Sequence, residues 1–430
     1  MANETDPPAL GTRPDGAGRD AATPVVADFY DRFPYPGDPL QDGPPPGYNW
    51  RWCVDSVRAF SLGSLPPRDA GGERAWRILD AGCGTGVSTD YLCHLNPGSD
   101  VLAVDISPAS IEVARERTRR SGAAGRVGEL RIELRNLMAL DDEGQFDHIN
   151  SVGVLHHLAR PDEGLRALAR RLKPGGLIHL FLYAQAGRWE IHRLQGALMM
   201  LGAGSGADGL RLGRQLLRDL PANNRLRRHH EERWAVDTAA DVNFADMYLH
   251  PQETAYTVES LFAVIRSSGL AFAGFSNPDV WDPARLLSGE TLERARQLPL
   301  RQQWLLVESL DPAISHFEFF LANSGPSESE AWRLPPDSGA VDDETLLASA
   351  LERNRCLWGW PGTALLGPDM EPLDLDPTDA TLLEAVERAP TDTPLASLPL
   401  VMPPRERAER ARRLLRQRVL HRLARRARAA

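Results

Sequence analysis

The sequence predicts an α/β fold with a doubly wound parallel sheet, on two observations. Apolar segments of strand length alternate with helical segments from Arg77 to about Ala184. That alternation is typical of a parallel sheet covered by helices on both faces. The segments "RILDAG" and "DVLAVDIS" are near-continuous apolar runs, as expected of parallel strands buried on both sides.

The remaining elements of this region follow in order. The helix after the second strand has clear boundaries, with Ser107 at the N-cap, Pro108 in the first turn and Gly122 at the end. Its sequence, "SPASIEVARERTRRSG", is long enough to cross back over the sheet. Further strands are expected at 130–134, 146–153 and 177–184, with a helix at 161–176.

Residues 187–256 interrupt the alternation with helical, arginine-rich sequence. The alternation resumes with a helix and a strand over 257–276, and a final strand is expected at 315–323. We therefore predict a helical cap insertion over the carboxyl edge of the sheet, where ligands of open α/β sheets bind. The domain so defined spans 23–323, and an aromatic N-terminal arm occupies 23–60.

The segments outside this domain differ in composition. Residues 1–22 are rich in Pro, Gly and Asp and are expected to be disordered. A polar linker over 324–340 leads to a small accessory module over 341–402. We expect this module to contain two helices and to serve an accessory or dimerisation role.

The last segment, 403–430, is expected to form a basic amphipathic helix, with Leu415, Val419 and Leu423 on one face. Residues 405–428 hold 11 Arg and two Glu, so they carry +9, and the net charge of −10 leaves about −19 on the rest of the chain. Such an acidic body argues against DNA as a partner. The tail could contact RNA, an anionic membrane, the chain's own acidic surface or a second copy, and the last two require the fewest assumptions.

The cysteines and the N-terminus indicate a cytoplasmic protein. The four cysteines (Cys53, Cys83, Cys93 and Cys356) are too few and too scattered for a disulfide framework. The N-terminus has no apolar leader segment, and no stretch of eighteen apolar residues could span a membrane. We therefore expect reduced thiols in a cytoplasmic enzyme.

A glycine-rich turn, Gly82-Cys83-Gly84-Thr85-Gly86, follows the first strand. A dinucleotide fingerprint would need its third glycine where Val87 stands, and Asp80 beside the turn would oppose a pyrophosphate. That carboxylate suits an ammonium group instead, and Asp105 at the end of the next strand can accept hydrogen bonds from ribose hydroxyls. An amino-acid head joined to a ribose describes S-adenosyl-L-methionine.

Three segments in this order resemble the class I S-adenosylmethionine-dependent methyltransferase family: "ILDAGCGTG", the acid in "VDIS", and "FDHINSVGVLHHLARPDEGLRALARRLKPGGLIHL". The resemblance is close over 77–184 and looser beyond. It implies a Rossmann-like sheet of seven strands whose last strand is antiparallel. The segments "FYDRFPYP", "GRWEI" and "DMYLHPQE" are similar to features of a bacterial subgroup of that family.

The resemblance also implies a set of cofactor-binding residues. The turn glycines would line the methionine part, Asp80 would approach its ammonium, and Asp105 would bind the ribose. Where the family often has an acidic residue for the adenine amino group, this chain has Asn136, whose amide can both accept and donate. The implied set is Asp80, Gly82, Gly84, Gly86, Asp105, Ile106, Asn136, Leu137, Asn150 and Ser151.

Three residues are candidates for catalysis: His156, His157 and Tyr30. Either histidine could accept a proton from the methyl acceptor, although "VLHHL" is equally consistent with pocket architecture. Tyr30 lies among the arm's aromatic residues and could close over the cofactor with its ring facing the positive sulfonium. Transfer from a sulfonium releases a neutral thioether, so alignment and exclusion of water could supply most of the catalysis.

The segment "FADMYLHPQETAY" holds Asp246, His250, Glu253 and Tyr256. Their spacing matches no standard metal site, so we predict no metal and leave pocket lining or helix capping as their roles.

We therefore predict methyl transfer to an O, N or C nucleophile of a small-molecule acceptor, since a cap of this size would obstruct a polymer. A nicotinamide-dependent oxidoreductase is a third possibility, but Val87 and Asp80 argue against it. Two alternatives remain: a non-catalytic protein that binds the cofactor as a scaffold or regulator, and a methyltransferase acting on protein or tRNA.

Overall fold

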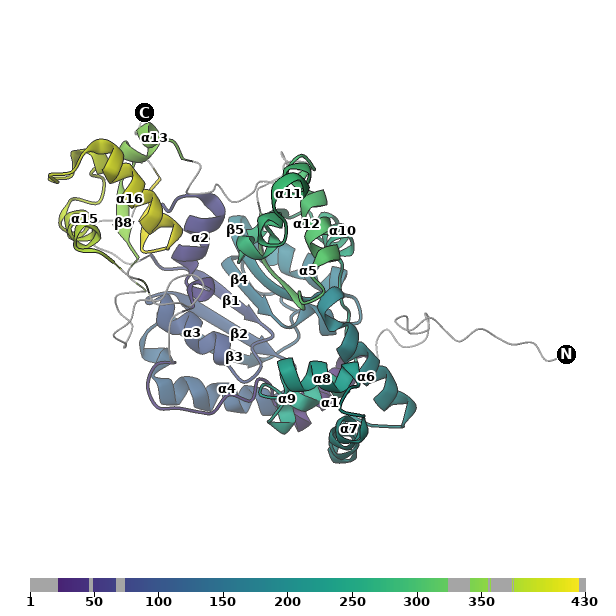
Figure 1. Cartoon of the computed structure of the whole chain (residues 1–430). Helices are drawn as coiled ribbons and strands as arrows, with labels where there is room; N and C mark the ends of the chain where they lie inside the picture. Colours follow the sequence, from purple (N-terminus) through teal and green to yellow (C-terminus); the bar gives the residue numbers. More distant parts are fainter. Residues whose placement is uncertain are drawn as a thin grey trace.

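The computed structural model describes residues 22–45, 49–66, 74–323, 341–354, 356, 373 and 375–424. Seven strands form one sheet in the order β3-β2-β1-β4-β5-β7-β6, at the centre of Figure 1. The strands are β1 (Arg77–Ala81), β2 (Asp100–Asp105), β3 (Glu129–Leu134), β4 (Phe146–Val152), β5 (Leu172–Tyr183), β6 (Ala271–Phe275) and β7 (His316–Ala322).

The register of this sheet confirms the predicted fold. Strand β1 pairs in parallel with β2 and β4, so that Asp80 lies opposite Ala103 on one side and Asn150 on the other. Strand β7 runs antiparallel to both β5 and β6. The sheet is therefore Rossmann-like, with seven strands and an antiparallel last strand. Because the strand order reverses between β1 and β4, their carboxyl ends border the crevice where ligands of such sheets bind.

Helices cover both faces of the sheet. Helix α4 (Pro108–Ser121) begins as expected, because the Ser107 side chain accepts a hydrogen bond from the Ser110 amide, and Gly122 ends it with a φ of 78°. Helix α5 stops at Arg171, whereas the sequence predicts a helix to residue 176. That prediction was wrong because Pro174 disfavours helical backbone at Lys173, and Leu172 instead joins β5 opposite Phe146. Besides α4, the helices of this domain outside the cap include α3 (Val87–Leu95), α5 (Pro161–Arg171), α10 (Val258–Ser268), α11 (Gly289–Arg296) and α12 (Leu300–Leu310).

Between β5 and α10 the chain forms a group of helices, α6 (Trp189–Met200), α7 (Ala207–Asp219), α8 (Arg225–His229), η5 (His230–Trp234) and α9 (Asp241–Leu249). Figure 1 shows α6, α7, α8 and α9 beside the N-terminal helix α1 (Ala22–Arg32), beyond the edge of the sheet. Phe29 of α1 is buried in one hydrophobic cluster with Ile191, Leu194 and Phe244 of this group. The N-terminal arm is therefore part of the cap.

The C-terminal residues form a unit on the other side of the domain (Figure 1). It contains α13 (Asp343–Leu347), β8 (Leu351–Arg353), α15 (Pro377–Arg388), α16 (Pro404–Arg416) and β9 (Leu420–Arg422). Leu382 and Leu414 of this unit share a cluster with Trp50 of η1 (Trp50–Trp52), Val57 of α2 (Val54–Leu62) and Phe320 of the sheet.

The prediction of a single helix over 403–430 was wrong. Helix α16 ends at Arg416, Arg418 has a φ of 57°, and residues 420–422 form β9, which pairs antiparallel with β8. The reversal brings Val419 and Leu423 into the core of this unit. The arginines of α16 contact the unit's own acids, since Arg410 lies 2.7 Å from Asp376 and 3.0 Å from Asp379.

Several predictions fall on residues outside the described ranges: disorder at 1–21, the linker at 324–340 and the end of the tail at 425–430. The sulfur atoms of Cys53 and Cys356 lie 2.8 Å apart, and the Cys356 thiol donates to the Leu95 carbonyl at 3.0 Å. Within the described ranges, no helix is long and apolar enough to cross a membrane.

Candidate active site

A cavity of about 910 Å³ lies at the carboxyl edge of the sheet. Its wall combines the glycine turn after β1, the ends of β2, β4 and β5, the N-terminal arm and the cap. Eight of the predicted site residues line it: Tyr30, Gly82, Gly84, Asp105, Ile106, Asn136, Leu137 and His157. Five others lie outside its lining: Asp80, Gly86, Asn150, Ser151 and His156.

The glycine turn is held closely against the N-terminal arm. Gly84 has a φ of 50°, and a Cβ added there would lie 2.3 Å from the carbonyl oxygen of Tyr35. The neighbouring Thr85 donates its amide to the same carbonyl at 3.0 Å and its hydroxyl to the Pro36 carbonyl at 2.7 Å. Position 84 therefore needs glycine both for its backbone conformation and for this approach.

Gly86 has a different role from the other two glycines. A Cβ at this position would lie 2.8 Å from the Cα of Ala114 in helix α4. Gly86 therefore permits close packing of α3 on α4, and the structure does not place it against the cavity.

Asp105 ends β2 at the floor of the cavity. Its carboxylate accepts hydrogen bonds from the Gly84 amide at 2.8 Å and the Ser107 amide at 2.9 Å. Burial raises the pKa of Asp105, against these hydrogen bonds. The residues that would meet the ribose and the adenine, Asp105, Ile106, Asn136 and Leu137, lie together on this side of the cavity.

Asp80 lies behind the turn. Its carboxylate accepts hydrogen bonds from Ser88 at 2.7 Å, Thr89 at 2.6 Å and the Asn150 amide at 2.8 Å. These bonds join β1, α3 and β4. The ammonium contact implied by the resemblance is not evident at Asp80, because its oxygens already have protein partners and it does not line the cavity.

The hydrogen bonds at Asp80 continue across the sheet. The Asn150 side-chain oxygen lies 2.9 Å from His179 Nδ1, and His179 Nε2 lies 3.1 Å from Glu318. Glu318 also pairs with Arg51 at 2.6 Å. Burial opposes ionisation of Glu318, but the hydrogen bond and charge of His179 and the charge of Arg51 outweigh it and lower its pKa to about 2.

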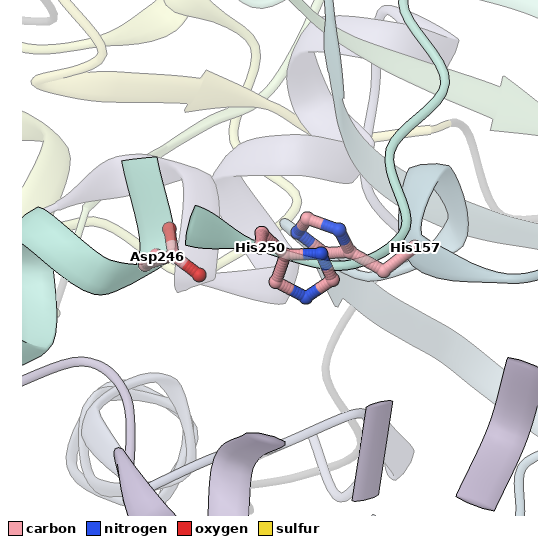
Figure 2. Close-up of side chains that lie close together, drawn as sticks. All are labelled: His157, Asp246 and His250. Atoms are coloured by element: carbon pink, nitrogen blue, oxygen red, sulfur yellow. The ribbon is translucent and has the colours of Figure 1, made fainter. Parts of the chain in front are cut away.

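On the cap side, His157, Asp246 and His250 form the cluster shown in Figure 2. One nitrogen of each imidazole and one carboxylate oxygen lie within 4.8 Å of one another. Tyr30 of α1 donates its hydroxyl to Asp246 at 3.0 Å. Burial raises the pKa of Asp246 to about 7, against the hydrogen bond from Tyr30, and lowers the pKa of His157 to about 4.

His156 does not belong to this cluster and does not line the cavity. Its ring stacks on Tyr183 with centroids 3.8 Å apart and is fully buried. Burial lowers the pKa of His156 well below its ordinary value. Of the two histidines, only His157 lines the cavity.

Arg188 is a lining residue that the sequence did not single out as a site residue. It makes two hydrogen bonds to Glu253, each of 2.8 Å, and its guanidinium lies 3.5 Å from the centre of the Tyr183 ring. Both charged side chains are almost fully buried. The sequence segments "GRWEI" and "DMYLHPQE", which resemble features of the bacterial subgroup, contain Arg188 and Glu253 and could have pointed to this pair.

The comparisons with known proteins give the family. Residues 79–178 match the model described as "Methyltransferase domain". The chain is 47% identical over 381 residues to "Uncharacterized protein syc1184_c" of Synechococcus, covering 87% of each chain. It belongs to the family of that protein. With the fold and the glycine turn described above, the domain is that of an S-adenosylmethionine-dependent methyltransferase, and its cofactor is S-adenosyl-L-methionine.

Two further matches are partial. The "Ubiquinone biosynthesis O-methyltransferase" of Xanthomonas euvesicatoria pv. vesicatoria is 34% identical over 104 residues, which are 24% of this chain and 41% of that enzyme. The solved structure of PKMT2 from Rickettsia typhi in complex with AdoHcy superposes with a TM-score of 0.54 at 17% identity. That alignment covers 72% of this chain and 59% of PKMT2, and it supports the fold.

Proposed function

We propose that this methyltransferase transfers the methyl group of S-adenosylmethionine to an oxygen, nitrogen or carbon nucleophile of a small molecule enclosed by the cap. The observation that supports this most is that one cavity is lined both by the glycine turn and by His157 and Asp246 of the cluster in Figure 2. Its volume of about 910 Å³ lies in the range of sites for small ligands, roughly 300–1,000 Å³.

The two ends of this cavity suit the two reactants. Asp105 and Asn136 would hold the ribose and adenine, and Gly82 and Gly84 would face the methionine part. The acceptor would then lie on the cap side, where the lining includes Tyr183, Trp234, Asn243, Asp246 and Met247. This mixture of aromatic surface and polar groups favours a partly apolar acceptor with a polar reacting group.

The chemistry requires little of the protein beyond geometry. The nucleophile attacks the methyl carbon, the carbon–sulfur bond breaks, and S-adenosylhomocysteine leaves as a neutral thioether. Holding the two reactants in line and excluding water would therefore supply much of the rate. An acceptor that carries a proton must also lose it, and Tyr30 and His157 are the predicted catalytic residues that face the cavity.

Calorimetric titration with S-adenosylmethionine tests the cofactor end. We expect binding by the wild type and loss of at least about tenfold in affinity for Asp105→Ala, a loss of one or two charge-assisted hydrogen bonds. Asp100→Ala, an exposed residue at the opposite end of the same strand, is the matched control and should bind as the wild type does.

Transfer of a tritiated methyl group then tests the acceptor class. We expect label in a small-molecule extract rather than in protein or tRNA fractions. Label in protein or tRNA would contradict the small-molecule proposal. Cofactor binding without transfer to any fraction would favour the scaffold alternative.

A further inference from the structure

We propose that His157, Asp246 and His250 form a binding site for a divalent first-row transition-metal ion that contacts the methyl acceptor. Two imidazoles and one carboxylate are a ligand set used for such ions when other positions stay open. The three side chains come from η3 (Leu155–His157), helix α9 and the residue that ends α9, and all three are buried. Figure 2 shows the three side chains close together, with Asp246 on a helix and His157 on a separate segment.

The spacing of the three donor atoms supports this assignment. Because they lie within 4.8 Å of one another, a point exists within about 2.8 Å of all three. The two imidazole rings lie with centroids 3.8 Å apart and planes 32° apart, so one ring must rotate before both in-plane lone pairs meet an ion at bond lengths of about 2.0–2.2 Å. Asp246 and His250 are four residues apart, a spacing that places two ligands on one side of a helix.

The surroundings of His157 match those of a metal ligand. Its Nδ1 lies 2.8 Å from the carbonyl oxygen of Gln252, which can only accept, so Nδ1 carries the proton. The lone pair of His157 is therefore on Nε2. A ring nitrogen anchored to a backbone carbonyl is the usual support of a ligating histidine.

Asp246 lacks a counter-ion among the described residues, although it is buried. The guanidinium whose charge acts on Asp246, that of Arg188, is already bound to Glu253 through two hydrogen bonds. The Tyr30 hydroxyl, which donates to Asp246, contributes no formal charge. Burying an uncompensated carboxylate is costly, and a bound cation would offset that cost.

At His250 the ion would compete with one backbone donor. The Gln252 amide donates to His250 Nδ1 at 3.1 Å, toward the long end of the hydrogen-bond range, while Nε2 has no partner among the described residues. Coordination through Nδ1 would replace that single hydrogen bond. The remaining coordination positions would face the cavity, because His157 and Asp246 line it.

The role of this ion, unlike its binding, rests on the proposed function. An acceptor hydroxyl bound to the ion would lose its proton to solvent at a lower pH than in water. The oxygen would then take the methyl group, and the carbon–sulfur bond electrons would leave with S-adenosylhomocysteine. The site therefore favours hydroxyl compounds as acceptors.

Cobalt titration tests the site without turnover. Tag-free protein is stripped with a chelator, titrated with Co²⁺ and followed by visible absorption, and the metal content of the untreated protein is measured. We expect one Co²⁺ per chain, with affinity reduced at least about tenfold in Asp246→Asn and in His157→Gln. His316→Gln, a histidine of the same cavity outside the cluster, is the matched control and should keep the wild-type affinity.

Two readouts keep failure of the site distinct from failure of the fold or of the proposed function. Each variant is checked by circular dichroism and by calorimetric binding of S-adenosylmethionine, which depends on the other end of the cavity. Absence of the visible band in folded, cofactor-binding wild type would overturn the site. A band that persists in Asp246→Asn and His157→Gln would overturn it as well.

Discussion

Gly84 and Asp105, at the cofactor end of the cavity, are 21 residues apart, whereas Tyr30 and Asp246, at the cap end, are separated by 216. At the first end, one strand–turn–helix unit and the next strand supply most of the groups. At the second, an N-terminal helix, a turn after β4 and a distant cap helix must come together. One cavity therefore combines a locally encoded half with a half that forms only when distant elements pack together.

The buried pair of Arg188 and Glu253 gives the largest expected effect. Arg188→Met would leave Glu253 buried without its cation, which should lower the free energy of unfolding by about 3–5 kcal/mol. Thermal or urea unfolding measures this loss. The exposed pair of Arg294 and Glu290 is the matched control, and Arg294→Met should leave the melting temperature unchanged. A loss of stability in Arg188→Met no larger than that in Arg294→Met would contradict the expected contribution of the buried pair.

Gly84→Ala tests the close approach of the turn to the N-terminal arm at the cofactor half. The new Cβ would meet the Tyr35 carbonyl in a left-handed backbone conformation, so we expect a loss of about 2–4 kcal/mol in stability and weaker S-adenosylmethionine binding. Gly98→Ala has the same sign of φ, 77°, with no atom within 4 Å of its Cβ. Gly98→Ala therefore measures the free-energy cost of a side chain in this backbone conformation alone. Unchanged S-adenosylmethionine binding in both variants would contradict a role of the close approach at Gly84 in shaping the cofactor site.

Acid unfolding tests the series of hydrogen bonds that links Asp80, beside the glycine turn, to Glu318 through Asn150 and His179. The pKa of Glu318 is lowered from 4.5 to about 2, so its contribution to stability is complete above pH 4.5 and is lost as the pH falls toward 2. Glu318→Gln should therefore be less stable than the wild type at neutral pH, by about 2–3 kcal/mol, and the difference should shrink between pH 4.5 and 2. Urea unfolding across this pH range measures it, and a constant difference would contradict the assigned pKa.

Tyr30→Phe gives the smallest expected effect. Loss of its hydrogen bond to Asp246 should cost about 1 kcal/mol of stability. We expect the S-adenosylmethionine affinity to stay within about twofold of wild type, while methyl transfer slows. An S-adenosylmethionine affinity that falls as far as in Asp105→Ala would show that the cofactor half and the cap half of the cavity do not act independently.

The sheet and the cofactor half were predictable from the sequence because their signals are local. A buried parallel strand, a turn with glycines and a helix with Ser107, Pro108 and Gly122 at its ends are each specified within a few residues. A local pattern also led to a wrong prediction. The apolar spacing of Leu415, Val419 and Leu423 indicated one continuous helix, but the helix ends before Arg418 and the chain continues into β9.

Only the tertiary structure decided which distant side chains meet. Asp80 keeps its predicted place at the end of β1, yet its oxygens bind Ser88, Thr89 and Asn150 and do not line the cavity. The spacing of Asp246 and His250 did not point to a cluster with His157, because His157 comes from another part of the chain. Strand and turn preferences act over a few residues, whereas convergence of side chains depends on how whole elements pack, and this is why the sequence determined the scaffold while tertiary packing decided the cap cluster.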